Sequence, residues 1–154
     1  MDKEQYIAAL RTSVAEFEKL RPQNSREDLD ISGADLSGCD LRGVQLRDVT
    51  LRDINFEGAD LTGANLTHSD LRGSRFKGAK LADVNMLRVE LEGADLRGAI
   101  LSGFDADSLM CLNACMFNGV RWGKEVLEYF LGILNRSEEW EIKYQVVPRA
   151  GKRG

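Results

Sequence analysis

The sequence predicts an all-β solenoid, in which the chain winds into a coil of short sides and tight corners. Two observations predict this fold class. Apolar residues recur with a period of five over residues 29–118, and Gly, Asp or Asn ends most of the five-residue units. The apolar spacing alternates between two and three, which averages about 144° per residue and lies between the roughly 100° of a helix and the 180° of a strand. Neither regular element alone produces this pattern.

Each unit is predicted to form one side and one corner of the coil. From Leu29 to Asn118 the chain divides into eighteen units, and the third residue, which we call the centre, is Leu in eleven of them. The spacing of two puts the first and third residues of a unit on one side of an extended segment, and the spacing of three requires a turn before the next pair. Gly ends ten units and Asp or Asn ends five more, and these residues tolerate tight turns.

Several units resemble those of the pentapeptide-repeat family, whose loose consensus is A(D/N)LXX. The closest are ADLSG (34–38), ADLTGANL (59–66) and ADLRG (94–98). The resemblance implies a right-handed quadrilateral β-helix with four units per coil and with the first and third residues of each unit inside. Eighteen units then make about 4.5 coils, and strand spacings of about 4.8 Å give a rod roughly 22 Å long.

We predict three segments: an N-terminal capping helix with its linker (1–28), the repeat (29–118), and a C-terminal part (119–154). Apolar residues spaced by three and four over residues 3–20 predict an amphipathic helix that ends at Arg21 and Pro22. A stack of strands leaves unpaired ends, so we expect this helix to cover the first coil. A helix that docks a partner is the alternative.

The C-terminal part is predicted to hold a helix over 124–135, a strand-like segment with alternating apolar residues, and a basic tail. The helix is apolar nearly all round, and outward positions of the last coils become apolar. We therefore expect the helix to fold onto this patch and to leave a second face for solvent or for a twin subunit, as a homodimer. The candidate interface residues are Leu87, Ile100, Met110, Leu112, Phe117, Phe130, Leu134 and Trp140.

The residues that carry chemistry do not form a catalytic pattern, so we expect no enzyme activity, no cofactor and no metal. The one histidine, His68, falls at a predicted corner, and acids such as Asp60 at the second position of a unit are predicted to be solvated surface groups. The three cysteines show no CxxC spacing and are interpreted as small packing residues. The glycines do not follow a phosphate-binding pattern.

Composition limits the partners only weakly. The formal charge is -4, with 43% hydrophobic and 30% charged residues, which is typical of an ordinary soluble protein. The first twenty residues lack the apolar core of a signal peptide, and no apolar run approaches the length of a membrane span. We therefore expect a cytoplasmic protein that binds neither membranes nor nucleic acid directly.

Two functions follow from the family resemblance. Some pentapeptide-repeat proteins protect DNA gyrase from quinolones or toxins as rod-shaped acidic mimics of DNA, so modulation of gyrase is one hypothesis. Residues 29–118 contain fourteen Asp or Glu and nine Lys or Arg, with the two signs interspersed, whereas a mimic of DNA needs a more continuous negative field. We therefore favour a non-catalytic protein-protein interaction or scaffolding module. An apolar patch on one wall would favour the scaffold, and a long acidic stripe would favour the mimic.

Overall fold

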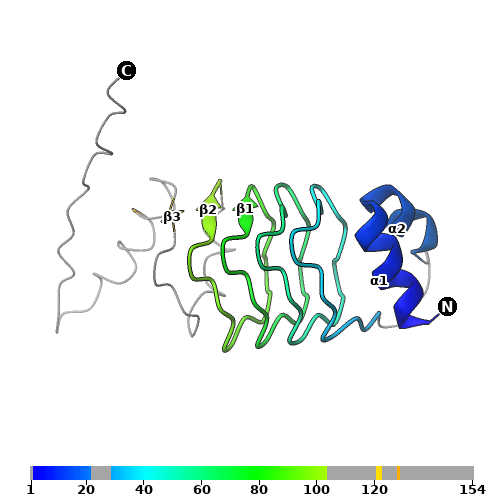
Figure 1. Ribbon diagram of the computed structural model, residues 1–154. Helices are drawn as coiled ribbons and strands as arrows, with labels where there is room; N and C mark the ends of the chain where they lie inside the picture. Colours follow the sequence, from blue (N-terminus) through cyan, green and yellow to red (C-terminus); the bar gives the residue numbers. More distant parts are fainter. Residues whose placement is uncertain (1, 22–28, 104–120, 123–127, 129–154) are drawn as a thin grey trace, which may run out of the picture.

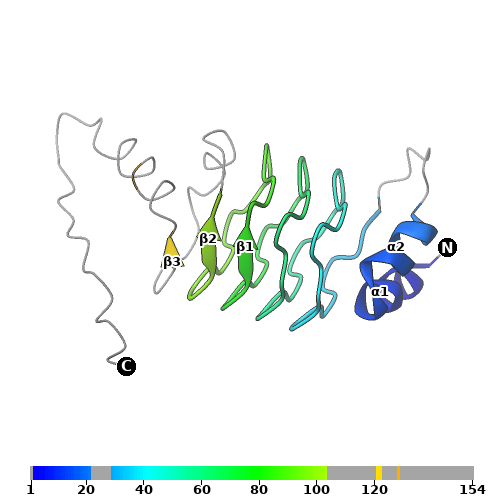
Figure 2. The same ribbon diagram turned by 90° about the horizontal axis from the view of Figure 1, so that it is seen from above.

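The computed structural model describes residues 2–21, 29–103, 121–122 and 128. Figure 1 shows a stack of chain turns with two helices at its N-terminal end. The helices are α1 (Lys3–Thr12) and α2 (Val14–Leu20), and the strands are β1 (Lys80–Ala82), β2 (Ile100–Ser102) and β3 (Arg121–Trp122). The three strands form a parallel sheet in the order β1-β2-β3. Figure 2 shows from above that the stack lies between the helices and β3.

A parallel backbone ladder with a spacing of twenty residues holds the stack together. Isolated bridges join Asp30 to Thr50 and continue in the same register to the pair of Arg75 and Asp95. The pairing of β1 with β2 keeps this spacing. Four five-residue units therefore separate each residue from its neighbour in the next coil. We call the four sets of stacked units walls: the first wall has units beginning at 29, 49, 69 and 89, the second at 34, 54, 74 and 94, the third at 39, 59, 79 and 99, and the fourth at 44, 64 and 84.

The interior is the stack of unit centres that the sequence predicts. Every centre from Ile31 to Leu101 is buried, and the first residues of the units are buried too, except for the half-buried Leu29 and Cys39. The rings of Phe56 and Phe76, which are ladder neighbours inside the second wall, stack with centroids 5.2 Å apart. Burying one such side chain contributes about 1.5–3 kcal/mol, so the repeated centres supply most of the apolar stabilisation.

The corners explain the residue at the fifth position. Each fifth residue from Gly33 to Gly103 has a positive φ, and ten of these residues are glycine. An L-residue costs roughly 1–2 kcal/mol in this left-handed region, which glycine occupies without a penalty. The corners without glycine are Asp48, Asp53, His68, Asp83 and Arg88. The prediction of a tight turn at each fifth position is confirmed, including His68 at its corner.

The N-terminal segment forms two helices, whereas the sequence pattern predicted one continuous helix over residues 3–20. α1 begins with a capping box between Asp2 and Gln5. Ser13 is extended, with φ -170° and ψ 155°, and its hydroxyl caps α2 by accepting a hydrogen bond from the Glu16 amide. The break at Ser13 lets both helices turn an apolar side to the first coil, where Leu10 and Phe17 are buried.

The ladder changes register near its C-terminal end. β2 pairs Ile100 with Arg121 and Leu101 with Trp122, so the spacing is 21 residues instead of twenty. From Ile100 to Arg121 the chain thus advances by one residue more than four complete units, and the ladder extends beyond the predicted end of the repeat at 118. Glu128, inside the predicted helix 124–135, has helical backbone. The rest of that helix, the strand-like segment and the basic tail lie outside the described residues.

Leu61→Lys tests the assignment of centres to the interior. Leu61 is fully buried among other centres, so a lysine there would place an unpaired ammonium in an apolar interior. We expect the free energy of unfolding in urea to fall by several kcal/mol, on the order of 3–5 kcal/mol. The control Leu61→Met conserves volume and should cost less than about 1.5 kcal/mol. Equal stability of the lysine variant and the parent would show that the register is wrong.

Candidate functional site

The second residue of most units forms a hydrogen bond that stabilises the corner. The side-chain oxygen of an Asp or Asn accepts a hydrogen bond from the backbone N–H two residues later, as Asp35 does from Ser37 at 3.1 Å and Asn65 does from Thr67 at 3.1 Å. This arrangement is an Asx turn. It recurs at Asp30, Asp40, Asn55, Asp60, Asp70, Asn85 and Asp95. These acids are predicted from the sequence only as solvated groups, although their recurrence three residues before a corner residue was a visible signal.

Ion pairs cover the first three walls. On the first wall the Asp70 carboxylate binds both Arg52 and Arg72, and the latter also lies 3.2 Å from Glu90. The hydrogen bond from the Arg72 side chain holds the pKa of Asp70 well below its usual range. Other pairs are Arg75 with Glu57 and Arg97 with Asp95 on the second wall, and Arg42 with Asp40 and Lys80 with Asp60 on the third. Positive groups thus neutralise the acids locally.

The fourth wall differs because uncharged groups occupy its middle. Gln45, Asn65 and Asn85 are successive ladder neighbours, and the Asn65 amide donates to Gln45 Oε1 at 3.1 Å. Beside them lie Thr67, whose hydroxyl donates to Asn65 Oδ1 at 2.6 Å, and Leu87. We call these five residues the amide strip. Charged side chains flank it: Asp48 and Arg88 stand at corners, and Arg47 stands at the fourth position of its unit, as Thr67 and Leu87 do.

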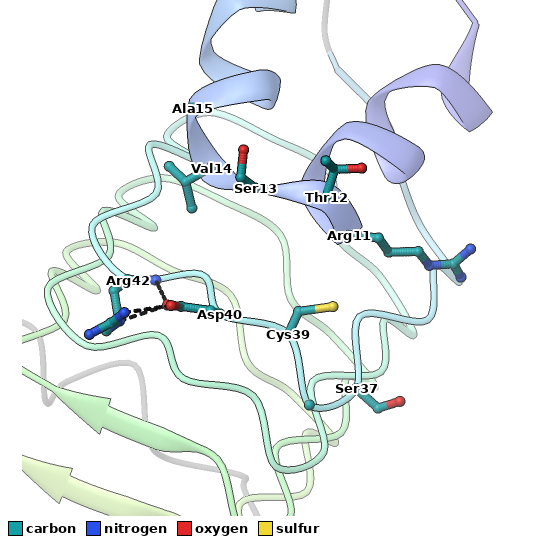
Figure 3. Close-up of a pocket in the computed structure, with 10 residues that line it drawn as sticks. Arg11, Thr12, Ser13, Val14, Ala15, Ser37, Cys39, Asp40 and Arg42 are labelled. Atoms are coloured by element: carbon teal, nitrogen blue, oxygen red, sulfur yellow. Dashed lines mark hydrogen bonds and ion pairs between the residues drawn. The ribbon is translucent and has the colours of Figure 1, made fainter.

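A groove lies between the helices and the first coil. Its volume is about 640 Å³, and Figure 3 shows its lining residues, with the helical residues above those of the coil. The helical residues are Arg11, Thr12, Ser13, Val14 and Ala15, and the coil residues are Ser37, Gly38, Cys39, Asp40 and Arg42. Burial raises the pKa of the Cys39 thiol, which disfavours the reactive thiolate at neutral pH. The groove is therefore a candidate binding site because of its shape and its backbone groups, and not because of a reactive thiol.

The repeat also decides the family. The family model described as "Pentapeptide repeats (8 copies)" matches residues 39–78 and again residues 64–103. Residues 39–103 of the chain belong to the pentapeptide-repeat family. No curated protein sequence matches it significantly.

Solved pentapeptide-repeat structures are similar to part of the chain. The protein Rfr23 from the cyanobacterium Cyanothece 51142 is 30% identical, with a TM-score of 0.35, and the match covers 62% of this chain and 57% of that protein. A pentapeptide repeat protein from Nostoc Pcc 7120 is 29% identical, with a TM-score of 0.44, over 63% of this chain and 74% of the other. QnrB1, a plasmid-mediated fluoroquinolone resistance protein, is 17% identical, with a TM-score of 0.24, over 78% of this chain and 74% of its own. This chain thus spans little more than half the length of Rfr23.

The candidate interface of this pentapeptide-repeat protein is only partly within the described residues. Ile100 lies at the second position of a unit in the third wall and Leu87 at the fourth position of a unit in the fourth wall, and both are half-buried. These two residues are therefore on different walls. The other six candidates lie outside the described residues: Met110, Leu112, Phe117, Phe130, Leu134 and Trp140. The homodimer through the C-terminal helix stays a prediction.

Within the ranges that the structure describes, no group of three or more His, Cys, Asp or Glu side chains is placed to hold a metal ion. His68 Nδ1 lies 3.2 Å from Asp48 Oδ1. Asp48 occupies the equivalent corner of the fourth wall in the preceding coil. Among the same residues, no helix has the length and apolar character that crossing a bilayer requires.

Asp60→Asn tests the role of the ionised second-position acids. Hydrogen bonding from Thr62, aided by Lys80, lowers the pKa of Asp60 from 3.8 to about 2. A depressed pKa stabilises the fold above pH 4, and this contribution is lost as the pH falls toward 2. Asparagine keeps the Asx turn but does not titrate, so the variant should cost about 1 kcal/mol at neutral pH and lose less stability in acid. Urea unfolding at several pH values measures both effects, and identical acid losses in variant and parent would contradict the assignment.

Proposed function

We propose that this protein is a non-catalytic protein-protein interaction or scaffolding module, built on a right-handed four-sided rod of about 4.5 coils. The observation that carries the proposal is the amide strip on the fourth wall. Its middle column, Gln45, Asn65 and Asn85, is neutral, whereas the same column of each other wall contains an ion-paired acid, which is Asp70, Asp95 or Asp60. The partner is a protein, because the strip offers hydrogen-bonding groups and apolar surface but little charge.

The charge distribution around the amide strip supports this proposal. Charged residues are depleted from the cores of protein interfaces and are tolerated at their rims. Binding at the strip would desolvate amides and a methyl group, which costs less than stripping water from paired carboxylates and guanidinium groups. The charges of the fourth wall lie beside the strip. Arg47 pairs with Asp48 at 2.9 Å, and Arg88 occupies the last described corner of this wall.

Rigidity supports the same role. The ladder fixes the backbone beneath Gln45, Asn65 and Asn85 at intervals of about 4.8 Å. Hydrogen bonds already order the side chains, since Asn65 donates to Gln45 and accepts from Thr67. Little conformational entropy remains to be lost when a partner binds a surface that is ordered beforehand.

Modulation of DNA gyrase is the second candidate, and it rests on membership of the pentapeptide-repeat family. Asp40 and Asp60 are ladder neighbours on the third wall, which favours a local negative field. Arg42 and Lys80 pair with these two acids, however, at 2.5 and 3.0 Å. Duplex DNA carries one negative charge per about 1.7 Å of its axis, and alternating ion pairs reproduce no such density. The described coils therefore favour a protein-binding scaffold over a mimic of DNA.

A supercoiling assay separates the two candidates. We expect ATP-driven supercoiling by bacterial gyrase to be unchanged by a molar excess of the full chain, with or without a quinolone, because the acids are neutralised. The double variant Arg42→Gln with Lys80→Gln, which unmasks Asp40 and Asp60, serves as a comparison. Inhibition or quinolone protection by the unmodified protein would favour the gyrase hypothesis over the scaffold.

Photo-crosslinking tests the amide strip directly. Asn85 and Arg75 are second-position residues of the same coil on different walls, so a photoreactive amino acid at 85 can be compared with one at 75. We expect cells of the native host to yield a specific crosslinked protein only from position 85. Asn65→Asp keeps the Asx turn and adds one charge to the strip, so it should reduce that crosslink at least threefold. Crosslinks that are equal at both positions, or unaffected by Asn65→Asp, would overturn the assignment of the fourth wall.

A further inference from the structure

The N-terminal end of the third wall is an unpaired strand edge. Deeper in the stack, the Asp60 amide donates to the Cys39 carbonyl at 3.0 Å, and the Asp60 carbonyl accepts from the Leu41 amide at 2.8 Å. The Thr62 carbonyl accepts from the Gly43 amide at 2.9 Å. Each second and fourth residue thus pairs with the preceding coil. Asp40 and Arg42 hold the same positions in the first coil, where no coil precedes them.

Side chains of the helices pair with this edge on the other walls. Lys3 donates to the Ser32 carbonyl on the first wall, and Arg11 Nε donates to the Asp35 carbonyl on the second at 2.9 Å. On the fourth wall Arg21 donates to the carbonyls of Gln45 and Arg47, and Glu18 accepts from the Gln45 amide at 3.0 Å. These five contacts pair the Ser32 and Asp35 carbonyls on the first two walls and, on the fourth wall, the Gln45 N–H and the carbonyls of Gln45 and Arg47.

The third wall receives no such contact within the described part of the chain. The Asp40 N–H, the Asp40 carbonyl and the Arg42 carbonyl have no partner there, although their equivalents one coil later are all paired. The groove lies at this point, as Figure 3 shows, with Asp40 and Cys39 below Ser13 and Val14. Cys39 is half-buried, whereas Val44, its counterpart on the fourth wall, is fully buried. The helices thus leave open both the backbone edge and the apolar interior beside it.

We propose that this groove binds an extended peptide segment of a partner protein, which adds a strand parallel to residues 38–42. The added strand would accept a hydrogen bond from the Asp40 N–H and donate to the Asp40 and Arg42 carbonyls, as the ladder does elsewhere. Pairing by strand addition uses backbone groups, so the side chains of the peptide set its specificity. The proposal deepens the scaffolding function and rests on it, but it concerns a different surface from the amide strip.

The groove defines the chemistry of the peptide. A small apolar residue fits over Cys39, as Ala59 does on the other side of the same unit, and it faces Val14 and Ala15. An amide or a base is favoured opposite Asp40, because on the same wall Asp60 pairs with a base, Lys80, at the same position of the adjacent coil. In a parallel strand the preceding residues approach Arg11, whose terminal nitrogens have no partner in the described residues, so an acidic residue is favoured there. The motif is an acid, then a small apolar residue, then an amide or a base.

Titration of the isotope-labelled full chain with a capped peptide Glu-Gly-Ala-Asn-Leu-Ser tests the proposal by NMR. We expect shifts concentrated at the amides of Gly38, Asp40 and Arg42, with none at the amide strip. The Asp40 amide should exchange with solvent at least threefold more slowly when the peptide is bound, because it gains a hydrogen bond. Replacing the Glu of the peptide by Gln should weaken binding about threefold at low salt.

Two substitutions at one position provide the matched control. Asp40→Pro removes the backbone N–H, and Asp40→Ala loses the same carboxylate but keeps the N–H. Proline is tolerated at a strand edge, and the Asp40 N–H has no described partner to lose. We expect the proline variant to bind at least tenfold more weakly than the alanine variant. The exchange measurement on the unmodified chain decides the question if the proline variant unfolds.

Several outcomes would overturn the proposal. The first is the absence of chemical-shift changes at Gly38 to Arg42 at millimolar peptide, and the second is equal binding by the two Asp40 variants. The third is slow solvent exchange of the Asp40 amide without peptide, at a rate that depends on protein concentration. The last result would assign the edge to a second copy of the chain. If the peptide does not bind but position 85 gives a specific crosslink, the scaffolding function still stands. The two tests probe different walls, because Asp40 lies on the third wall and Asn85 on the fourth.

Discussion

The twenty-residue backbone ladder is the constraint on which the rest of the structure depends. It puts every centre above another centre, so Phe56 meets Phe76 and the leucines form continuous columns. The ladder is possible only because the chain turns after every unit, and each turn requires a residue with positive φ. Apolar burial supplies the stabilisation, and the corner residues supply the geometry that lets burial repeat.

The outward residues serve both the fold and the surface. An Asp or Asn at the second position closes its own corner, as Asp60 does by accepting from the Thr62 amide at 3.1 Å. The same carboxylate then pairs with a base on its own coil or on the next one, as with Lys80. Acids in this repeat are therefore engaged twice. On the fourth wall Asn65 and Asn85 keep the corner function with amides instead of carboxylates, so the second-position column of this wall is neutral.

The ends of the stack show what the ladder does not provide. At the N-terminal end the helices replace a preceding coil with long side chains, so that Arg21 alone pairs with two carbonyls. This replacement reaches three walls and leaves the Asp40 N–H and the Asp40 carbonyl without a partner in the described structure. At the other end β3 joins with a spacing of one extra residue. The surfaces at the two ends of the stack thus differ from those of the regular coils between them.

The sequence by itself determined the interior, the corners and the family, because each follows from a period of five that is local and repeated many times. It also predicted a helical cap, but not the break at Ser13, where one hydroxyl starts a new helix. Tertiary structure decided the neutral column of the fourth wall, the pairing of Arg52 with Asp70 and the groove beside Cys39. These features depend on which residues lie twenty positions apart and on how the helices pack on the first coil. The distances between the side chains concerned are set only when the coils stack.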